Sequence, residues 1–481
     1  MKWMTRGNAM LTLAFACGSV GAQELPRLPS LPSLLQPLSD TDEHSQVLAP
    51  SALVKLSDGP RAQPLRRETF DAPTIQLNEA VQMAVGWHPS IAANIATLGQ
   101  QAAGVSVARA GYYPQVRVGV GGSDSNTQIG NGSSVSATIT QTIYDFGKVS
   151  SSVDQAQALL NRQQAQVLRQ IDEIARQTAE AVVNAHRYQA LQTIAEQQLA
   201  ALERVLEMAR LRASAGVSTR SDPVQALSRV EGARASLLQI KTLSQQTRQR
   251  LRTFIGAPVP AAIGALPELQ ADALDWNQVP ETDALPEVLV AQAEQRAAAA
   301  QLLLAKAQRW PTISLEASVN RSINGVNPST LQHNGTYRAL MINLSSVLFQ
   351  GGALNAQVRA ATSAMEASRQ QIELVRLESN DQARIFREQA LGARETIAIQ
   401  IQRKKSIEQA RDIYRDQYKL GTRSIIDLLN AEQEFYQAQT DEQMARHEFW
   451  LSVVSYVGAT GLGREFYGLN HRTVQGMNLL P

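Results

Sequence analysis

The chain has 481 residues, with 45 Lys and Arg against 43 Asp and Glu, which gives a formal net charge of +2. A total so close to neutral offers no electrostatic reason to expect nucleic-acid binding. Aromatic residues make up only 5% of the chain while Ala and Gln are abundant, a composition that disfavours several globular cores and favours long helices packed through small residues.

The N-terminus has the pattern of a secretory signal peptide over residues 1–22. Two basic residues precede an apolar run, and small residues follow up to Ala22, the predicted cleavage site. The only cysteine, Cys17, lies inside this segment. Lipidation of Cys17 is the alternative, although Ala14 stands where a lipoprotein signal usually has Leu. After cleavage at Ala22 the mature chain has no thiol, which excludes disulfides, zinc–thiolate sites and cysteine nucleophiles.

Residues 23–73 are rich in Pro, Leu and Ser and show neither helical nor strand periodicity. They are predicted to form an extended or disordered leader, and a linker without a specific role is the simpler interpretation. No later segment holds 18 uninterrupted apolar residues, so no transmembrane helix is predicted. A secreted chain of this kind is periplasmic, extracellular or a β-barrel protein of an outer membrane.

A helical pattern runs from Leu77 to about Gly111 and stops before Pro114, which forces the preceding residue out of the helical region. Apolar and polar residues then alternate over 116–120 and again over 135–143, with a polar loop between them. This pattern predicts a hairpin of two strands. A soluble β-domain is the alternative to a membrane-embedded hairpin.

The stretch from Lys148 to Ala213 contains neither Gly nor Pro, and its apolar residues recur in steps of three, four or seven. Such a seam is typical of a coiled-coil helix, which here would be about 100 Å long. Gly216 is suited to the left-handed residue that ends a helix. Thr219 and Asp222 fit a capping box that opens a return helix reaching about Gly256.

The second half of the chain repeats this order. The turn residues Gly421, Ser424 and Asp427 each follow their first-half counterparts, Gly216, Thr219 and Asp222, by 205 positions. Gly147 precedes Gly216 by 69 residues, as Gly352 precedes Gly421. The predicted segments are a signal peptide at 1–22, an extension at 23–73, a first helix-strand-strand-helix repeat at 74–256, an equatorial linker at 257–285, a second repeat at 286–465 and a tail at 466–481.

Each repeat offers two strands, and four strands cannot close a barrel. An open sheet in lipid leaves unpaired backbone groups that cost several kcal/mol each, so several chains must share one barrel. One face of the strands is aliphatic, as lipid requires, and the other is polar, as a water-filled lumen requires. Aromatic residues at the strand–helix junctions would form an interfacial girdle or simply pack at helix ends: Tyr112, Tyr113, Tyr144, Trp310 and Phe349.

This architecture resembles the TolC-type outer-membrane efflux and secretion channels over about residues 74–465. The features that carry the resemblance are Pro114 and Pro311 at helix-to-strand corners, Gly147 and Gly352 at strand-to-helix corners, and the run "YKLGTRSIIDLLNAEQEFYQAQ" at 418–439. The resemblance implies an α+β membrane protein in the outer membrane. It also implies a homotrimer with a 12-stranded transmembrane barrel, four strands per chain, that continues as a periplasm-spanning α-helical coiled-coil barrel.

In such channels the helical tips close the tunnel, and a periplasmic adaptor recruited by an inner-membrane transporter opens it. The resemblance implies a gate in which Tyr418 and Arg423 face Ser221 and Asp222. Asp427 would fill an acidic ring, and the uncharged Asn430 at a second ring position implies weaker selection for cations. The tip turns are the expected adaptor contacts: Gly216, Val217, Gly421 and Thr422. The alternatives are that the two aspartates only cap helices and that Arg423 is a solvated charge.

None of the six histidines belongs to a pair with metal-ligand spacing, and no nucleophile–base arrangement is evident. We therefore expect no enzyme activity, cofactor or metal. The predicted function is a passive exit duct for type I secretion driven by an ABC transporter. The alternatives are the outer-membrane component of a drug efflux pump with a proton-driven transporter, and a periplasmic coiled-coil scaffold without a pore.

Overall fold

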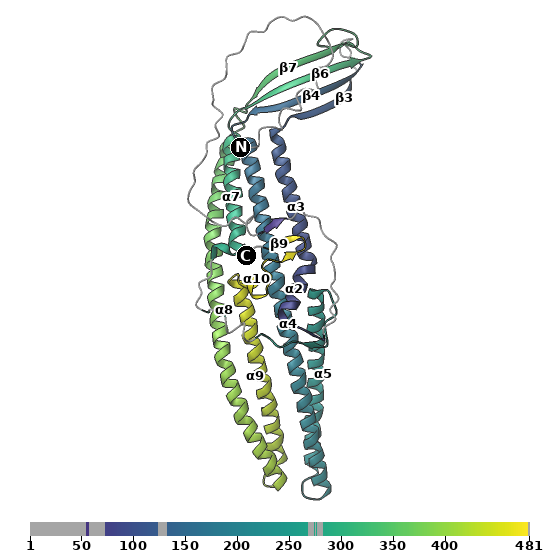
Figure 1. Cartoon of the computed structure of the whole chain (residues 1–481), viewed down its shortest axis with the longest axis vertical. Coiled ribbons are helices and arrows are strands. Elements are labelled where there is room, and N and C mark those ends of the chain that lie inside the picture. Colours follow the sequence, from purple (N-terminus) through teal and green to yellow (C-terminus); the bar gives the residue numbers. More distant parts are fainter. Residues whose placement is uncertain are drawn as a thin grey trace. The chain divides into compact units, whose positions relative to one another are not determined.

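The structure is a computed structural model that describes residues 54–56, 73–123, 132–267, 274, 276 and 282–479 (Figure 1). The predicted signal peptide at 1–22, Cys17 within it, and most of the predicted 23–73 extension lie outside these described residues. So does the centre of the first polar loop.

Both halves of the chain contain the same order of elements (Figure 1). The first half has α3 (Pro89–Arg109), β3 (Gln115–Ser123), β4 (Gly132–Tyr144), α4 (Lys148–Ser214) and α5 (Ser221–Ile255). The second half has α7 (Pro286–Ala307), β6 (Thr312–Ile323), β7 (Thr336–Ser345), α8 (Ala353–Leu420) and α9 (Ile425–Ala459). The predicted hairpins and the two long helices are therefore confirmed as elements.

The helix expected from Leu77 to Gly111 is in fact two helices, α2 (Leu77–Trp87) and α3. The break falls at His88, whose backbone is extended, with φ −59° and ψ 128°. Pro89 causes it, because a proline disfavours the helical conformation of the preceding residue but is well suited to a first helical position. The His88 ring then accepts a hydrogen bond from the Ser90 N–H and so caps α3.

The four long strands form one antiparallel sheet in the order β3-β4-β6-β7. Their register aligns one apolar residue from each strand in a single cross-strand row: Val116, Ile139, Ala317 and Leu340. The opposite face carries polar side chains, among which Asn343 donates a hydrogen bond of 2.9 Å to Glu316. Within the described residues β3 and β7 each pair on one side only, so both edges of the sheet are unpaired in a single chain.

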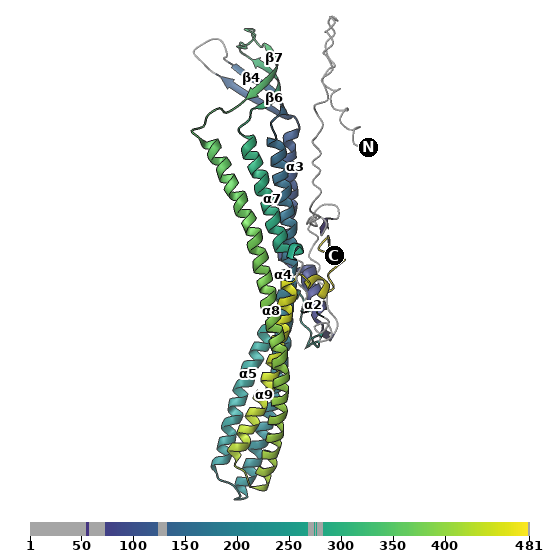
Figure 2. The same cartoon turned by 90° about the vertical axis from the view of Figure 1, so that its left-hand side faces the viewer.

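The long helices α4 and α8 pack against most of the other helices. α4 packs along α3, α5, α7 and α9, and α8 packs along α7 and α9 (Figure 2). The main core gathers α2, the middle of α4 and the end of α9, with residues such as Leu168, Ile171 and Val454 fully buried. None of the helices among the described residues combines the length and apolar character needed to cross a membrane.

Short strands from the predicted extension, the start of the first repeat, the linker and the tail pair beside this core. β2 (Thr74–Ile75) pairs in parallel with β5 (Ala262–Ile263), and β9 (Met477–Leu479) pairs with both β1 (Val54–Leu56) and β8 (Thr473–Val474). Among the residues that the structure describes, the other short helices are η1 (Ala110–Tyr112), η2 (Thr282–Ala284) and α10 (Gly463–Phe466).

Candidate functional site

The first tip joins α4 to α5. Gly216 has φ +72°, and the Val217 N–H donates to the Arg212 carbonyl oxygen at 2.9 Å, which closes the helix end as expected of a glycine there. The predicted capping box is wrong in its geometry. The Asp222 N–H donates to the Thr219 carbonyl at 3.3 Å, while the Thr219 hydroxyl donates to the Asp222 carboxylate. Among the described residues no backbone N–H of α5 donates to the Thr219 hydroxyl, so Thr219 does not cap this helix.

The second tip joins α8 to α9 through the same turn. Gly421 has φ +81°, and the Thr422 N–H donates to the Gln417 carbonyl at 3.0 Å. Ser424 is a true N-cap here, because its Oγ accepts from the Asp427 N–H at 3.2 Å. The same hydroxyl donates to the Asp427 carboxylate at 3.0 Å. The cap is therefore the Ser424 hydroxyl. Among the described residues, the second bond of a capping box, from the Ser424 N–H to the Asp427 carboxylate, is absent.

Tyr418 lies buried between the two hairpins, with 2% of its surface exposed. Burial raises the pKa of its phenol, and the negative charge of Asp222 acts in the same direction against the opposing charge of Arg212. Asp222 is thus close enough for its charge to act on the Tyr418 phenol, but among the described residues the buried Tyr418 hydroxyl has no hydrogen-bond partner, so the two predicted gate residues are not bonded to each other.

Arg423 does not join them. Its Nε donates to Gln417 at 3.0 Å, its guanidinium lies 3.6 Å from the Asp427 carboxylate, and its Cζ lies 4.3 Å from the centroid of the Tyr414 ring. Within the described part of the chain, no hydrogen bond or ion pair connects Arg423 to Ser221 or Asp222. Its partners all belong to its own hairpin.

Two arginines of the first repeat, which the sequence analysis did not single out, reach across to the second. Arg212 of α4 donates to the carbonyl oxygens of Tyr418 and Lys419 at 3.0 and 3.2 Å. Arg229 of α5 donates to Gln433 at 2.8 Å and to Asn430 at 3.3 Å. Asn430, the uncharged residue at the second predicted ring position, therefore has a guanidinium beside it. The one sequence signal for Arg212 is its place in the last turn of a helix, where a cation is favourable.

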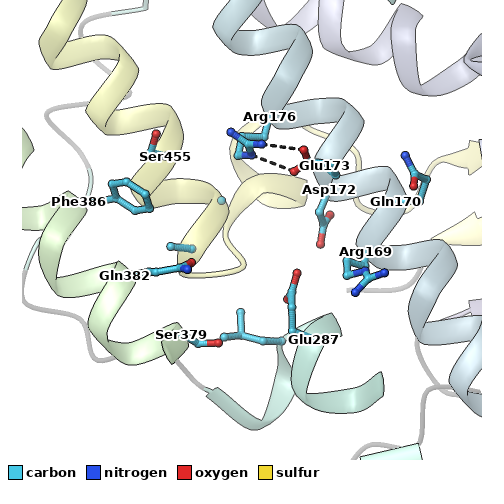
Figure 3. A pocket seen from close by; sticks show the side chains of 13 residues that line it. Arg169, Gln170, Asp172, Glu173, Arg176, Glu287, Ser379, Gln382, Phe386 and Ser455 are labelled. Carbon is cyan, nitrogen blue, oxygen red and sulfur yellow. Dashed lines mark hydrogen bonds and ion pairs between the residues drawn. The ribbon is translucent and has the colours of Figure 1, made fainter. Parts of the chain in front are cut away.

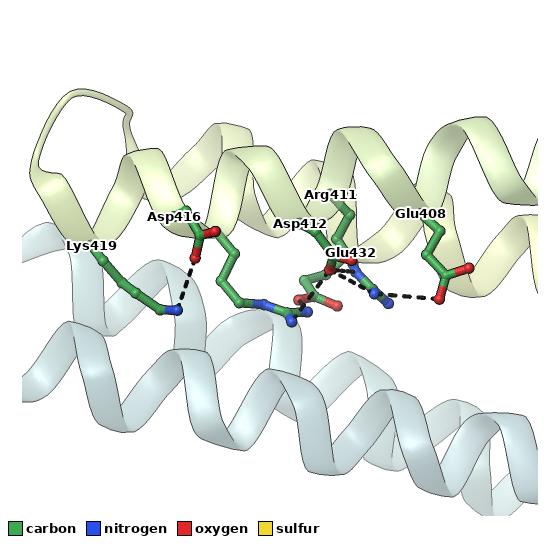
Figure 4. Close-up of polar contacts among 7 residues, drawn as sticks. Glu408, Arg411, Asp412, Asp416, Lys419 and Glu432 are labelled. Atoms are coloured by element: carbon green, nitrogen blue, oxygen red, sulfur yellow. Dashed lines mark hydrogen bonds and ion pairs between the residues drawn. The ribbon is translucent and has the colours of Figure 1, made fainter.

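The seam between α8 and α9 contains buried charge (Figure 4). Glu432 is 1% exposed and accepts from Arg415 at 2.7 Å. Farther along the seam Glu442, also buried, pairs with Lys404 at 2.6 Å and Arg446 at 3.1 Å. Burial alone would raise the pKa of Glu442, but the hydrogen bonds from these two cations lower it.

A cavity of about 500 Å³ lies where the end of α9 meets the start of α7, between α4 and α8 (Figure 3). Asp172 and Glu287 point towards one another across it. Burial raises the pKa of Asp172 to about 6, against the pull of Arg464 at 3.4 Å, and the charge of Glu287 adds to the rise. Among the described residues no group of His, Cys, Asp and Glu could hold a metal ion.

The predicted corner residues lie at the ends of the strands and helices. Gly147 and Gly352 directly precede α4 and α8 with φ +89° and +83°, and Pro114 and Pro311 directly precede β3 and β6. The five junction aromatics are each at least half exposed. Trp310 also stacks on Phe146 at a centroid distance of 5.4 Å, so packing at a helix end and exposure as in a girdle occur together.

Comparison with known proteins agrees with this geometry. The family model for outer membrane efflux proteins matches residues 80–257 and 284–460. The toluene efflux pump outer membrane protein TtgC of Pseudomonas putida is 27% identical over 78% of this chain and 80% of its own. Protein CyaE of Bordetella pertussis is 27% identical over 65% of this chain and 66% of its own.

Among solved structures, the outer membrane protein VceC from Vibrio cholerae superimposes with a TM-score of 0.68 at 19% identity, over 80% of this chain and 96% of VceC. This likeness shows a shared fold. Members of the matched family work with periplasmic adaptors and inner-membrane transporters. Repeated hairpins, the four-stranded sheet and the two-part match to the family model lead to one conclusion: this chain belongs to the outer membrane efflux protein family.

Proposed function

We propose that the protein is a passive exit duct, assembled from three copies, that an adaptor opens at the helical tips. The observation that carries the proposal is the sheet with two unpaired edges. Each edge strand leaves backbone donors and acceptors unmatched, and a barrel that closes on further copies satisfies them. Three copies of four strands make the 12-stranded barrel that the family resemblance implies.

The long helices support the same assembly. α8 has 68 residues, which corresponds to a rod of about 100 Å, several times the thickness of a bilayer core. Only five of its residues are buried in the chain, while large apolar side chains along it stay exposed: Leu374, Leu377, Ile385, Ile399 and Ile413. A neighbouring copy that packs against α8 would cover them, and the rods would then surround a periplasmic tunnel.

Two candidate functions differ in the cargo that the duct carries. The printed names of relatives that match about three quarters of the chain, such as a toluene efflux pump protein and an outer membrane efflux protein of Brucella suis, favour small-molecule efflux with an inner-membrane pump. The weak lipidation motif at Cys17 favours type I protein secretion with an ABC transporter. In both functions the driving energy comes from the transporter, and the duct itself carries out no catalysis.

The assembly is tested with the purified full-length protein. We expect cross-linking to end at a trimer, detergent to be needed for extraction, and planar bilayers to show ion-conducting channels. A water-soluble species without current would instead fit the periplasmic scaffold. Deletion of the gene then separates the two cargoes: increased sensitivity to toxic small molecules supports efflux, while loss of a secreted or surface protein supports type I secretion.

A further inference from the structure

The end of α8 is held by a side chain from the other hairpin. Arg212 lies in the last turn of α4, and its Nη1 donates to the carbonyl oxygens of Tyr418 and Lys419. These two carbonyls belong to the last turn of α8, which ends at Leu420. The Tyr418 carbonyl also accepts from the Gly421 N–H at 3.0 Å, but a carbonyl oxygen can accept a second bond. Carbonyls in a last turn lie at the negative end of the helix, so a cation bound there is favourable. One guanidinium therefore ties the end of α8 to the end of α4.

The ring of Tyr418 also contacts the Arg212 guanidinium. The Arg212 Cζ lies 4.9 Å from the centroid of the Tyr418 ring, a distance that allows cation–π attraction. Tyr418 packs with apolar residues of three other helices, among them Leu206 of α4, Val230 of α5 and Leu428 of α9. The ring and the guanidinium thus belong to one cluster that contains all four helices of the two hairpins.

The contact is confined to one of the two repeats. The residue that corresponds to Arg212 in the second repeat is Gln417, and the one that corresponds to Tyr418 in the first is Ala213. The backbone turn after each is nevertheless the same, because Val217 and Thr422 donate equivalent hydrogen bonds. The tip turn therefore does not require an arginine, and the arginine has a role besides closing its own helix.

We propose that Arg212 is the positioning residue that keeps the two hairpin tips of a chain together in the closed duct. The proposal rests on the proposed function and names the contact by which that duct stays closed. Its acceptors are backbone carbonyls, which remain whatever side chains α8 carries. Arg423, whose partners lie within its own hairpin, does not hold the tips of one chain together.

The test compares Arg212→Gln with Arg423→Gln in the full-length protein. Gln is the residue that the second repeat uses at the equivalent turn, so Arg212→Gln keeps the turn and removes the contact between hairpins. Spin labels at two exposed tip positions, Val217 and Leu420, report the distance between the tips, and planar bilayers report the conducting fraction. We expect a longer and broader distance distribution, and roughly a tenfold larger conducting fraction, for Arg212→Gln.

Arg423→Gln should leave the distance between the tips of one chain unchanged. Arg212→Lys should lie between Arg212→Gln and wild type, because its ammonium can still donate to the carbonyls but lacks the planar group that lies over the Tyr418 ring. An unchanged tip distance in Arg212→Gln would overturn the proposal even if the protein conducts. A longer tip distance in a protein that never conducts would support the contact and refute the duct. Helical content by circular dichroism confirms that each variant is folded.

Discussion

Acidification from about pH 7.5 to about pH 5, the range in which histidines titrate, should weaken the contact between α4 and α9. His186 Nδ1 and His447 Nε2 lie 2.8 Å apart, and His447 Nδ1 lies 2.5 Å from the Gln443 carbonyl oxygen. Because a carbonyl only accepts, we assign the hydrogen of His447 to Nδ1, and its Nε2 then accepts from His186. Both rings are neutral in this arrangement.

The magnitude follows from the pKa of His447. Burial lowers this pKa from 6.5 to about 4 against the opposing hydrogen bond to Gln443, and the charges of Arg187 and Arg446 act in the same direction as burial. A base with a lower pKa in the packed state binds fewer protons there. The contact is therefore fully stable above about pH 6.5 and weakens as the pH falls towards 4. Acidification to about pH 5 removes about 2 kcal/mol through His447 alone, or ~30-fold in the local opening equilibrium.

Hydrogen–deuterium exchange on the purified protein measures this opening. After correction for the intrinsic pH dependence of exchange, protection over 181–190 and 441–450 should fall ~30-fold between the two pH values, while the part of α4 over 148–160, which has no histidine, should change far less. His447→Gln is the matched variant, because its amide oxygen accepts from His186 but takes up no proton. Equal protection of the wild type at both pH values would refute the reasoning, as would the same acid loss in His447→Gln.

Three further predictions concern the hairpins, and exchange of the tip and seam segments measures each. Ser424→Ala removes the N-cap of α9 and should destabilise its first turn by about 1 kcal/mol, with no comparable effect from Ser221→Ala, since Ser221 caps no backbone N–H. Gly421→Ala imposes a side chain at φ +81° and should cost about 1–2 kcal/mol, whereas Gly392→Ala, in open space within α8, should stabilise by up to about 1 kcal/mol. Glu442→Leu should cost about 3 kcal/mol because Lys404 loses its buried partner, and adding Lys404→Leu should recover most of the loss; no recovery in the double variant would contradict the buried-pair interpretation.

The sequence contained nearly all the information that defines the elements. Glycines at 147, 216, 352 and 421 mark helix ends because a left-handed backbone favours glycine there, and alternation locates the strands. The break before Pro89 was also readable, since the residue before a proline avoids the helical region. The helical periodicity of the residues before and after Pro89, however, favoured a single continuous helix.

The hydrogen-bond and ion-pair partners of individual side chains could not be predicted from the sequence in this way. Thr219 and Ser424 occupy equivalent positions, yet only Ser424 caps a backbone N–H. The same spacing that predicted a partner for Arg423 on the other hairpin is compatible with its actual partners, Gln417 and Tyr414, which lie six and nine residues earlier in its own hairpin. Which partner a side chain contacts depends on its rotamer and on its neighbours in the folded protein. The spacing of residues in the sequence does not determine either.

The two helical hairpins have the same order of elements and the same tip turn, but different side chains pack between their helices. Lys404 pairs with Glu442 where the first repeat places Leu199 and Leu237, and Arg411 lies over Phe435, 3.7 Å from its centroid, where the first repeat has an apolar pair.

Among the described residues, the charged residues that are less than a tenth exposed as whole residues all belong to this α8–α9 hairpin: Arg411, Glu432 and Glu442. Asp172, whose carboxyl group is also desolvated, faces the cavity between α4 and α7 and lies outside both hairpin tips. Ion pairs also join α4 to α5, Glu203 with Arg234 and Glu196 with Lys241, but all four side chains are about half exposed and such pairs contribute little. A buried pair costs several kcal/mol when one partner is lost. The cohesion of the α8–α9 hairpin therefore depends more strongly on the ionisation of its own side chains than that of the α4–α5 hairpin, which rests mainly on apolar burial.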